Sequence, residues 1–264
     1  MVWIPITLAA AAFQTARNVL QRSLTGPLSQ LGATYTRFLF GFPFALLYAA
    51  GVFALADVPL PSPGLAFFGW AALGGVAQIF GTAFLLRLFT LRNFSTGIAF
   101  SKSEILQVAL VGMLVLGDGV SLLAGVAIAV ATLGLLLLSR ETGGLAWHDL
   151  AADLTGRAAV LGLGTGGAFA IAAVAFRAAS LSLGHPSFVA SAAATLVVST
   201  LIQTLLMTVY LRWREPGQIG VVVRIWRRSL LPGLTGAAAS ACWFTAMTIE
   251  IGRASCRERV FRTV

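Results

Sequence analysis

The stretch VSLLAGVAIAVATLGLLLLS, residues 120–139, contains no charged residue over a length of twenty residues. A helix of about 20 residues spans the hydrocarbon core of a bilayer, and in lipid it satisfies its own backbone hydrogen bonds. The stretch therefore predicts a transmembrane helix. Seven more apolar segments of comparable length occur at 4–23, 31–53, 65–86, 95–116, 157–179, 187–211 and 230–250. Together they predict an all-α polytopic membrane protein, a bundle of about eight transmembrane helices.

The composition of the 264 residues supports this class independently. Hydrophobic residues make up 58% of the chain and charged residues only 10%, whereas soluble domains carry about 25% charged residues. The net charge of +9 is scattered over connections and helix ends. We therefore expect membrane lipid as a partner and no nucleic acid. Cys242 and Cys256 show neither metal-ligand spacing nor a convincing disulfide pairing.

A polar stretch at 140–156 divides the chain into two halves with a similar plan. Arg22 precedes a short polar turn with Pro27 in the first half, and Arg177 precedes one with Pro186 in the second. The third and eighth segments share a stretch of small residues followed by bulky apolar ones. We predict a first repeat of five helices at 1–139 and a second repeat at 157–250 with three helices. With five spans per complete half, the second copy would be inverted relative to the first.

Arginine placement predicts the orientation in the membrane. Alternate connections carry the basic residues, namely Arg22, Arg87, Arg92, Arg140, Arg157, Arg212, Arg214, Arg224, Arg227 and Arg228. The connections around 54–64, 117–119 and 180–186 contain no Lys or Arg. The positive-inside rule places the basic face in the cytoplasm and the N-terminus outside. We expect a multi-pass protein of the cell (inner) membrane whose first segment is a retained span rather than a signal peptide. The 212–228 cluster is interpreted as a topology signal with some anionic-lipid contact.

Polar residues inside the spans are the candidate functional residues, because charge at mid-bilayer costs about 2.5–3.5 kcal/mol on insertion scales. Gln14, Arg17, Asn18 and Gln21 form one stripe, and Glu104 shares a helical face with Gln107, Thr96, Asn93 and Gly97. Arg37 lies in the second segment, and Gln78 with Thr82 forms a pair in the third.

Glu104 has two interpretations, a transport residue or one half of a buried ion pair. Its natural partner is Arg17 or Arg37, because Glu104 is nearly the only acid inside the spans of the first half. Lys102 points away from this stripe and is expected to snorkel toward the cytoplasmic end. If the pairing holds, the first half lines a positively charged cleft suited to anions or zwitterions.

Other motif matches are rejected. GLGTGG at 162–167 fits a dinucleotide pattern, but it lies within an apolar span and is expected to permit close helix packing. The sequon at Asn93 abuts the membrane on the predicted cytoplasmic face. His148 and His185 have no partner at metal-ligand spacing, and no nucleophile–base arrangement occurs. We therefore expect no enzyme, no cofactor and no metal site.

Taken in order, several elements resemble the EamA-type branch of the drug/metabolite transporter superfamily. They are Pro27 followed by Arg37-Phe38, RNFSTGIAFSKSEILQ at 92–107, Gly117-Asp118, and WFTA at 243–246. The resemblance covers nearly the whole chain up to about Glu250. It implies ten helices in two inverted halves, a central cavity, and export or exchange of small metabolites. Many relatives have proline directly after the fourth-helix glutamate, where this chain has Ile105, so the resemblance leaves a kink there in question.

The C-terminal residues depart from this pattern. IGRASCRERV at 251–260 is the translation, in one frame, of the common sequencing-adaptor sequence ATCGGAAGAGCGTCGTGTAGGGAAAGAGTG. We expect 251–264 to be derived from an adaptor and the last two helices of the second repeat to be missing. The alternative is a short basic cytoplasmic tail.

Three functional hypotheses follow from these observations. The first is a secondary transporter of a small organic solute, with two halves that rock about a midplane cavity. The second is a membrane scaffold or lipid-carrier partner without transport, and the third is an intramembrane enzyme. Polar stripes favour transport. The candidate substrate-binding residues are Gln14, Arg17, Gln21, Arg37, Gln78, Glu104, Gln107 and Trp243.

Overall fold

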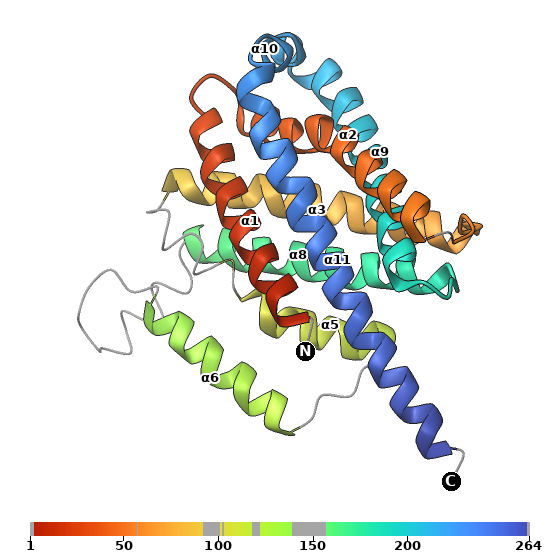
Figure 1. Ribbon diagram of the computed structural model, residues 1–264. Helices are drawn as coiled ribbons and strands as arrows, with labels where there is room; N and C mark the ends of the chain where they lie inside the picture. The colour runs from red at the N-terminus through yellow and green to blue at the C-terminus, as the bar shows by residue number, and fades with distance from the viewer. Residues whose placement is uncertain are drawn as a thin grey trace. The chain divides into compact units, whose positions relative to one another are not determined.

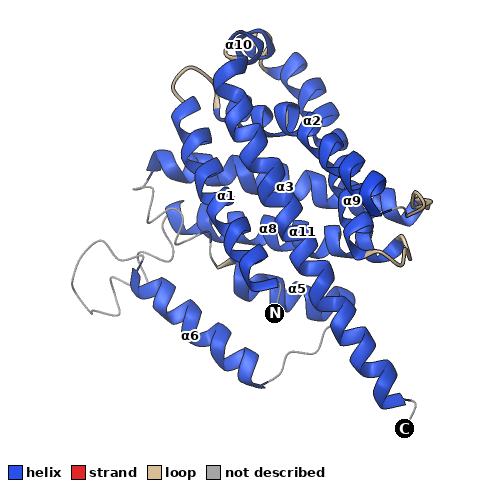
Figure 2. Cartoon of the chain, in the orientation of Figure 1, coloured by secondary structure: helices blue, strands red, loops and turns tan. Residues whose placement is uncertain are grey.

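The computed structural model describes residues 3–56, 58–91, 101, 103–117, 122–138 and 157–262. All regular elements among these residues are α-helices (Figure 2). The long helices are α1 (Trp3–Leu24), α2 (Gln30–Ala56), α3 (Leu65–Leu91), α8 (Arg157–Ser182), α9 (Phe188–Arg214) and α11 (Trp226–Arg262) (Figure 1). The shorter ones are α5 (Glu104–Leu116), α6 (Leu122–Leu138) and α10 (Gln218–Arg224).

Four of these helices are long and apolar enough to cross a membrane. The spans are Gln30–Leu55, Leu65–Leu91, Ala159–Ser182 and Phe188–Arg214. The prediction of an all-α protein of the membrane type is confirmed at this level. The predicted set of eight spans is only partly reproduced. The helices α1 and α11 are not among these four spans, and α5 and α6 contain only 13 and 17 residues. At a rise of 1.5 Å per residue, α5 covers only about 20 Å of a hydrocarbon core that is about 30 Å thick.

The distribution of polarity also fits a lipid environment. Leu47, Val209 and Leu122 are 68%, 70% and 87% exposed. Buried residues, in contrast, include many polar side chains on facing helices, such as Thr36 and Thr195. Aliphatic side chains on the surface can contact lipid acyl chains. Hydrogen-bonding groups, in contrast, are buried between helices and away from lipid.

The fourth apolar segment, predicted as one helix over 95–116, is described only in part. Ser101 is helical, Ser103 lies in a turn, and α5 begins only at Glu104. Nε2 of Gln107 donates to Oγ of Ser103 over 3.1 Å. Ser103 has helical backbone angles, and its carbonyl oxygen accepts the backbone N–H of Gln107 over 3.2 Å. Asn93, Thr96, Gly97 and Lys102, named for this segment, lie outside the described residues.

The chain divides into two compact units, residues 1–75 with 175–264 and residues 76–174. In the first unit α11 packs on α1, α2 and α9, and α2 packs along α9. In the second unit α5 contacts α6, and Leu88 of α3 is buried with Ala159 of α8. α3 and α8 each contribute residues to both units.

Glycines allow the closest helix contacts of the first unit. A Cβ atom built on Gly233 of α11 would lie 2.6 Å from the backbone carbon of Phe40 on α2. One built on Gly41 would lie 3.3 Å from the carbonyl oxygen of Gly233. This arrangement is typical of membrane helices, whose association depends on close backbone approach.

Two sets of turns are joined at opposite ends of α2 and α9. At one end Ser29 donates its backbone N–H to Oε1 of Gln218 over 3.2 Å and its hydroxyl to Oε2 of Glu215. At the other end Nε2 of His185 lies 2.9 Å from the carbonyl oxygen of Pro59. The turn before α2 therefore meets the turn after α9, and α2 and α9 run antiparallel.

The structure adds a helix to the 212–229 connection and continues the last helix beyond the predicted eighth span. The connection contains a helix of its own, α10, which is seven residues long. α11 is continuous from Trp226 to Arg262 with Pro232 inside it. No helix end therefore occurs at Glu250, where the predicted eighth span stops.

Candidate functional site

The polar stripe of α1 lies against its neighbouring helices. Arg17, Asn18 and Gln21 are 3%, 5% and 1% exposed. Their offsets of one, three and four residues place them on one face, because a helix turns once every 3.6 residues. Nε2 of Gln21 donates to the carbonyl oxygen of Ala33 on α2 over 3.1 Å. The stripe is thus part of the α1–α2 contact and does not face lipid.

Arg17 and Arg37 come together at one glycine of α11. A Cβ atom built on Gly236 would lie 3.0 Å from Cγ of Arg37 and 3.5 Å from Cδ of Arg17. Arg37 is 4% exposed, so both side chains are buried between α1, α2 and α11. The absence of a side chain at Gly236 provides the space that both arginine stems occupy.

The neighbours of the two guanidinium groups are polar. Arg17 donates from Nε and Nη2 to Oδ1 of Asn18, over 3.2 and 2.6 Å. Nη2 of Arg37 lies 3.5 Å from Oγ of Ser240 on α11, and its Cζ lies 5.2 Å from the ring centroid of Phe38. The two guanidinium groups are thus buried in polar surroundings between the same three helices.

Trp243 and Gln14 extend this group along α1 and α11. The indole Nε1 donates to Oε1 of Gln14 over 2.7 Å. The structure thus brings five of the predicted site residues into one group, which we call the arginine seam. It consists of Gln14, Arg17, Asn18, Gln21, Arg37, Gly236, Ser240 and Trp243.

Sequence reasoning missed the contribution of α11 beyond Trp243. Gly236, Ser240 and Trp243 are separated by four and three residues, which places them on one helical face. That spacing was a usable signal. It was weak, however, because small residues at such spacing also occur wherever membrane helices merely pack.

The remaining predicted residues belong to the second unit. Gln107 of α5 donates from Nε2 to the carbonyl oxygen of Leu163 on α8 over 3.2 Å, while its neighbours Ile105 and Leu106 are 49% and 40% exposed. Glu104 is half-buried at the start of α5. In α3 the carbonyl oxygen of Gln78 accepts from Oγ1 of Thr82 over 2.9 Å. Because Glu104 and the two arginines lie in different units, their pairing stays a prediction.

The glycines of the rejected dinucleotide motif serve helix packing, as predicted. A Cβ atom on Gly166 would lie 2.6 Å from Oγ of Ser103 and 2.8 Å from the backbone nitrogen of Glu104. One on Gly167 would lie 2.8 Å from Oε1 of Gln107. Small residues at this point let α8 approach the start of α5 and so position Glu104 and Gln107.

Gln203 of α9 is a buried polar residue that the sequence interpretation overlooked. It is 1% exposed, and its Nε2 donates to the carbonyl oxygen of Gly75 on α3 over 3.2 Å. A Cβ atom on Gly75 would lie 3.2 Å from Cγ of Gln203. Its isolated position in the apolar run TLIQTLL was the available signal.

Within the described parts of the chain, no three His, Cys, Asp or Glu side chains gather in a way that could hold a metal ion. His148, which the sequence interpretation considered, lies outside the described residues. Comparison with protein-family models, with curated proteins and with solved structures gives no match for this chain. The arrangement of the arginine seam is therefore the main guide to function. Its guanidinium groups offer forked N–H donors that match carboxylate and phosphate oxygens.

Proposed function

We propose that this protein is an integral membrane secondary transporter of the drug/metabolite type, which exports or exchanges a small organic solute through a midplane cavity. The observation that carries the proposal is the burial of Arg17 and Arg37 together at Gly236, between three helices. Ionisable residues within membrane-crossing segments are costly and usually mark solute or ion pathways. Burial of two arginines at one point is a costly arrangement, and it therefore favours a functional role for the site.

The chemistry of the seam favours a solute with a negatively charged group. Arginine binds carboxylates through two parallel hydrogen bonds, which fixes the orientation as well as the position of the ligand. Gln14, Ser240 and Trp243 add uncharged polar groups along the same helix faces. The proposed substrates are therefore small organic anions or zwitterions.

The packing of the first unit supports an inverted repeat. α2 and α9 hold corresponding places in the two predicted halves and run antiparallel. α2 contacts α11 at Gly41 and Gly233, and α9 contacts α3 at Gly75. Since α3 and α11 also hold corresponding places, these contacts are the equivalents that a two-fold axis in the membrane plane would generate. On this basis we propose a multi-pass inner-membrane protein of the EamA-type plan. The distribution of arginines over the connections favours an N-terminus outside.

The test is solute flux into proteoliposomes that contain this protein. Labelled carboxylates, amino acids and uncharged metabolites are compared, and we expect flux of at least one anion or zwitterion. Arg37→Gln is expected to lower this flux at least tenfold at equal protein content, and Arg37→Lys to restore only part of it, since lysine lacks the planar fork. Arg87→Gln, at an exposed position of α3, is the matched control.

Two outcomes would contradict the proposal. One is the absence of flux for every solute in a broad panel, which favours the scaffold or lipid-carrier alternative. The other is full flux in Arg37→Gln, which would leave the arginine seam with a structural role only.

A further inference from the structure

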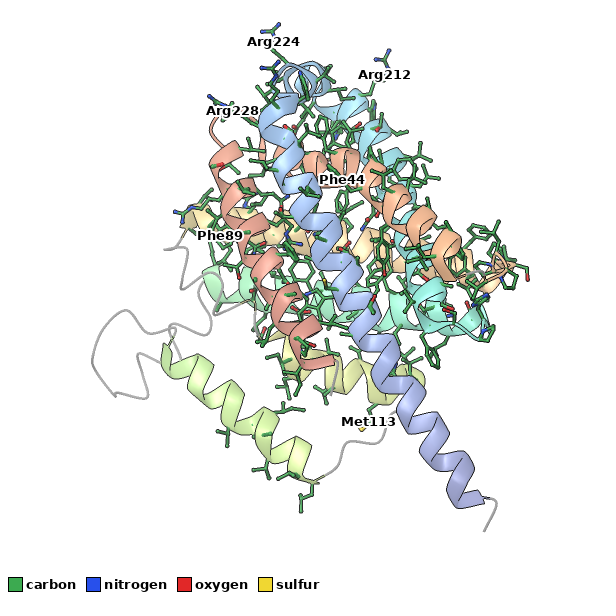
Figure 3. The ribbon with its side chains drawn as sticks, in the orientation of Figure 1. Phe44, Phe89, Met113, Arg212, Arg224 and Arg228 are labelled. Atoms are coloured by element: carbon green, nitrogen blue, oxygen red, sulfur yellow. The ribbon has the colours of Figure 1, made fainter. Side chains whose placement is uncertain are left out.

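A cluster of arginines and tryptophans occupies the connection between α9 and α11. It is separate from the arginine seam. We call it the arginine–tryptophan surface, and it consists of Arg212, Trp213, Arg214, Arg224, Trp226, Arg227 and Arg228. All five arginines are exposed, and the two indoles are 76% and 47% exposed. In Figure 3 the side chains of Arg212, Arg224 and Arg228 extend outward at the end of the unit where α10 lies.

The position of this surface relative to the spans is defined by α9. That helix is apolar and long enough to cross the membrane over Phe188–Arg214, so Arg212 and Arg214 lie in its last turn. α10 follows after a turn at Gly217, whose φ of 102° suits a residue without a Cβ atom. A group that ends a membrane-crossing helix lies at the level of the lipid headgroups.

The surrounding structure holds the surface in place and keeps its charge positive. Glu215 is the only acid between 212 and 228, and it accepts a hydrogen bond from the hydroxyl of Ser29. Gln218 accepts one from the backbone of the same serine. Val222 is fully buried and Val223 is 55% exposed, so α10 is anchored on one side and presents an apolar side chain on the other.

Two of the arginines each lie over the tryptophan that directly precedes them in the chain. Cζ of Arg214 is 5.1 Å from the ring centroid of Trp213, and Cζ of Arg227 is 5.4 Å from that of Trp226. These are cation–π distances. Because indole rings favour the boundary between headgroups and acyl chains, each stack would hold a guanidinium group at phosphate depth.

From these observations we infer that the arginine–tryptophan surface binds the headgroups of anionic phospholipids in the leaflet that it faces. The guanidinium groups bind the phosphodiester oxygens, while Trp213, Val223 and Trp226 enter the upper acyl region. The exposed apolar groups favour a lipid over a nucleic acid, since a nucleic acid would leave them in contact with water. Clustered basic residues beside a membrane segment are also the pattern by which anionic lipids are recognised.

The experiment titrates the detergent-solubilised full chain with phosphatidylglycerol or phosphatidylcholine and measures bound lipid by native mass spectrometry. We expect phosphatidylglycerol to bind at least tenfold more tightly, with affinity that falls as sodium chloride is raised. Each arginine near an anionic surface contributes about fivefold to binding. The triple variant Arg212→Gln/Arg224→Gln/Arg228→Gln should therefore lose between tenfold and about 100-fold in affinity for phosphatidylglycerol.

The double variant Arg87→Gln/Arg157→Gln is the matched control, because both of these arginines are exposed and neither belongs to the cluster, which lies at 212–228. It should keep the wild-type preference to within about threefold. The triple variant Arg212→Lys/Arg224→Lys/Arg228→Lys keeps the charge and should retain most of the affinity, which provides a second test if the glutamine variant fails to fold.

Equal binding of the two lipids would overturn the inference, as would a preference that does not respond to salt in the unmodified protein. Inorganic phosphate and a short oligothymidine are added in separate competitions. Displacement of the lipid by millimolar phosphate would identify a site for free phosphate, and tighter binding of the oligonucleotide than of the lipid would identify a nucleic-acid site. Either result would refute a lipid-specific surface.

Discussion

The indole of Trp243 on α11 donates a hydrogen bond of 2.7 Å to the side-chain oxygen of Gln14 on α1. The two residues are 229 positions apart in the chain. Their bond lies along the same two helices that bury Arg17 against Gly236. It therefore fixes the spacing of α1 and α11 beside the two arginines, and through that spacing it affects the proposed solute site.

Trp243→Phe removes this hydrogen bond and keeps most of the ring packing. Hydrogen bonds between membrane helices contribute about 0.6 kcal/mol on average and up to about 1.7 kcal/mol. We expect a loss of unfolding free energy in that range, measured by denaturant unfolding in mixed micelles. Gln14→Leu should cost a similar amount, and the double variant should cost less than the sum of the two, since both changes remove one interaction. Strictly additive costs would show that the bond contributes nothing.

Gly233→Ala tests the contact between α11 and α2. The new Cβ atom would lie 2.6 Å from backbone and side-chain atoms of Phe40, so a helix must shift. Overpacking of this kind costs about 1–3 kcal/mol. Gly51→Ala in α2 is the matched control, because nothing lies within 4 Å of its Cβ position. The control variant should have an unchanged free energy of unfolding or one that is higher by about 0.5–1 kcal/mol, because alanine stabilises a helix interior relative to glycine. Thermal unfolding of both variants gives the comparison, and equal stability would contradict the close contact.

The sequence was sufficient to predict the helical class and the α1 stripe, but it did not identify the neighbours of that stripe. Apolar length indicates a membrane helix directly, and a helical period places Arg17 and Gln21 on one face. The role of Gly236 and Ser240 depends on which helix packs against α1, and no local pattern specifies that partner. The seven-residue α10 was missed because contacts between turns, such as the bond from Ser29 to Gln218, are not visible in the hydropathy of the sequence.

Glu104→Gln is expected to impair flux more than membrane insertion. The carboxylate shares its end of α5 with Gln107, which contacts α8, whereas Ile105 next to it is 49% exposed. Ile105→Val should therefore leave flux unchanged and provides the control on the same helix. If Glu104 pairs with Arg37, combining Glu104→Gln with Arg37→Gln should reduce flux less than the product of the single effects. Unchanged flux in Glu104→Gln would assign the carboxylate a structural role.

Single cysteines test the arrangement of the turns and the orientation separately. The bonds of Ser29 to Glu215 and Gln218 join one set of turns, and the contact of His185 with Pro59 joins the other. In a protein with Cys242 and Cys256 replaced by alanine, we expect Gly26→Cys and Gly220→Cys to be labelled from one side of the membrane. Ser62→Cys and Ser182→Cys, at exposed positions of the second set, should be labelled from the other side.

The distribution of charge predicts which set of turns lies on the cytoplasmic side of the membrane. The turns around 212–228 contain five arginines, whereas those around 54–64 and 180–186 contain no Lys or Arg, so the first set is expected in the cytoplasm. An impermeant maleimide added to intact cells should then label the cysteines at 62 and 182 and leave those at 26 and 220 unmodified until the cells are opened. Labelling of the opposite pair in intact cells would keep the pairing of the turns but reverse the orientation. Labelling of one cysteine from each pair would contradict the antiparallel packing of α2 and α9 itself.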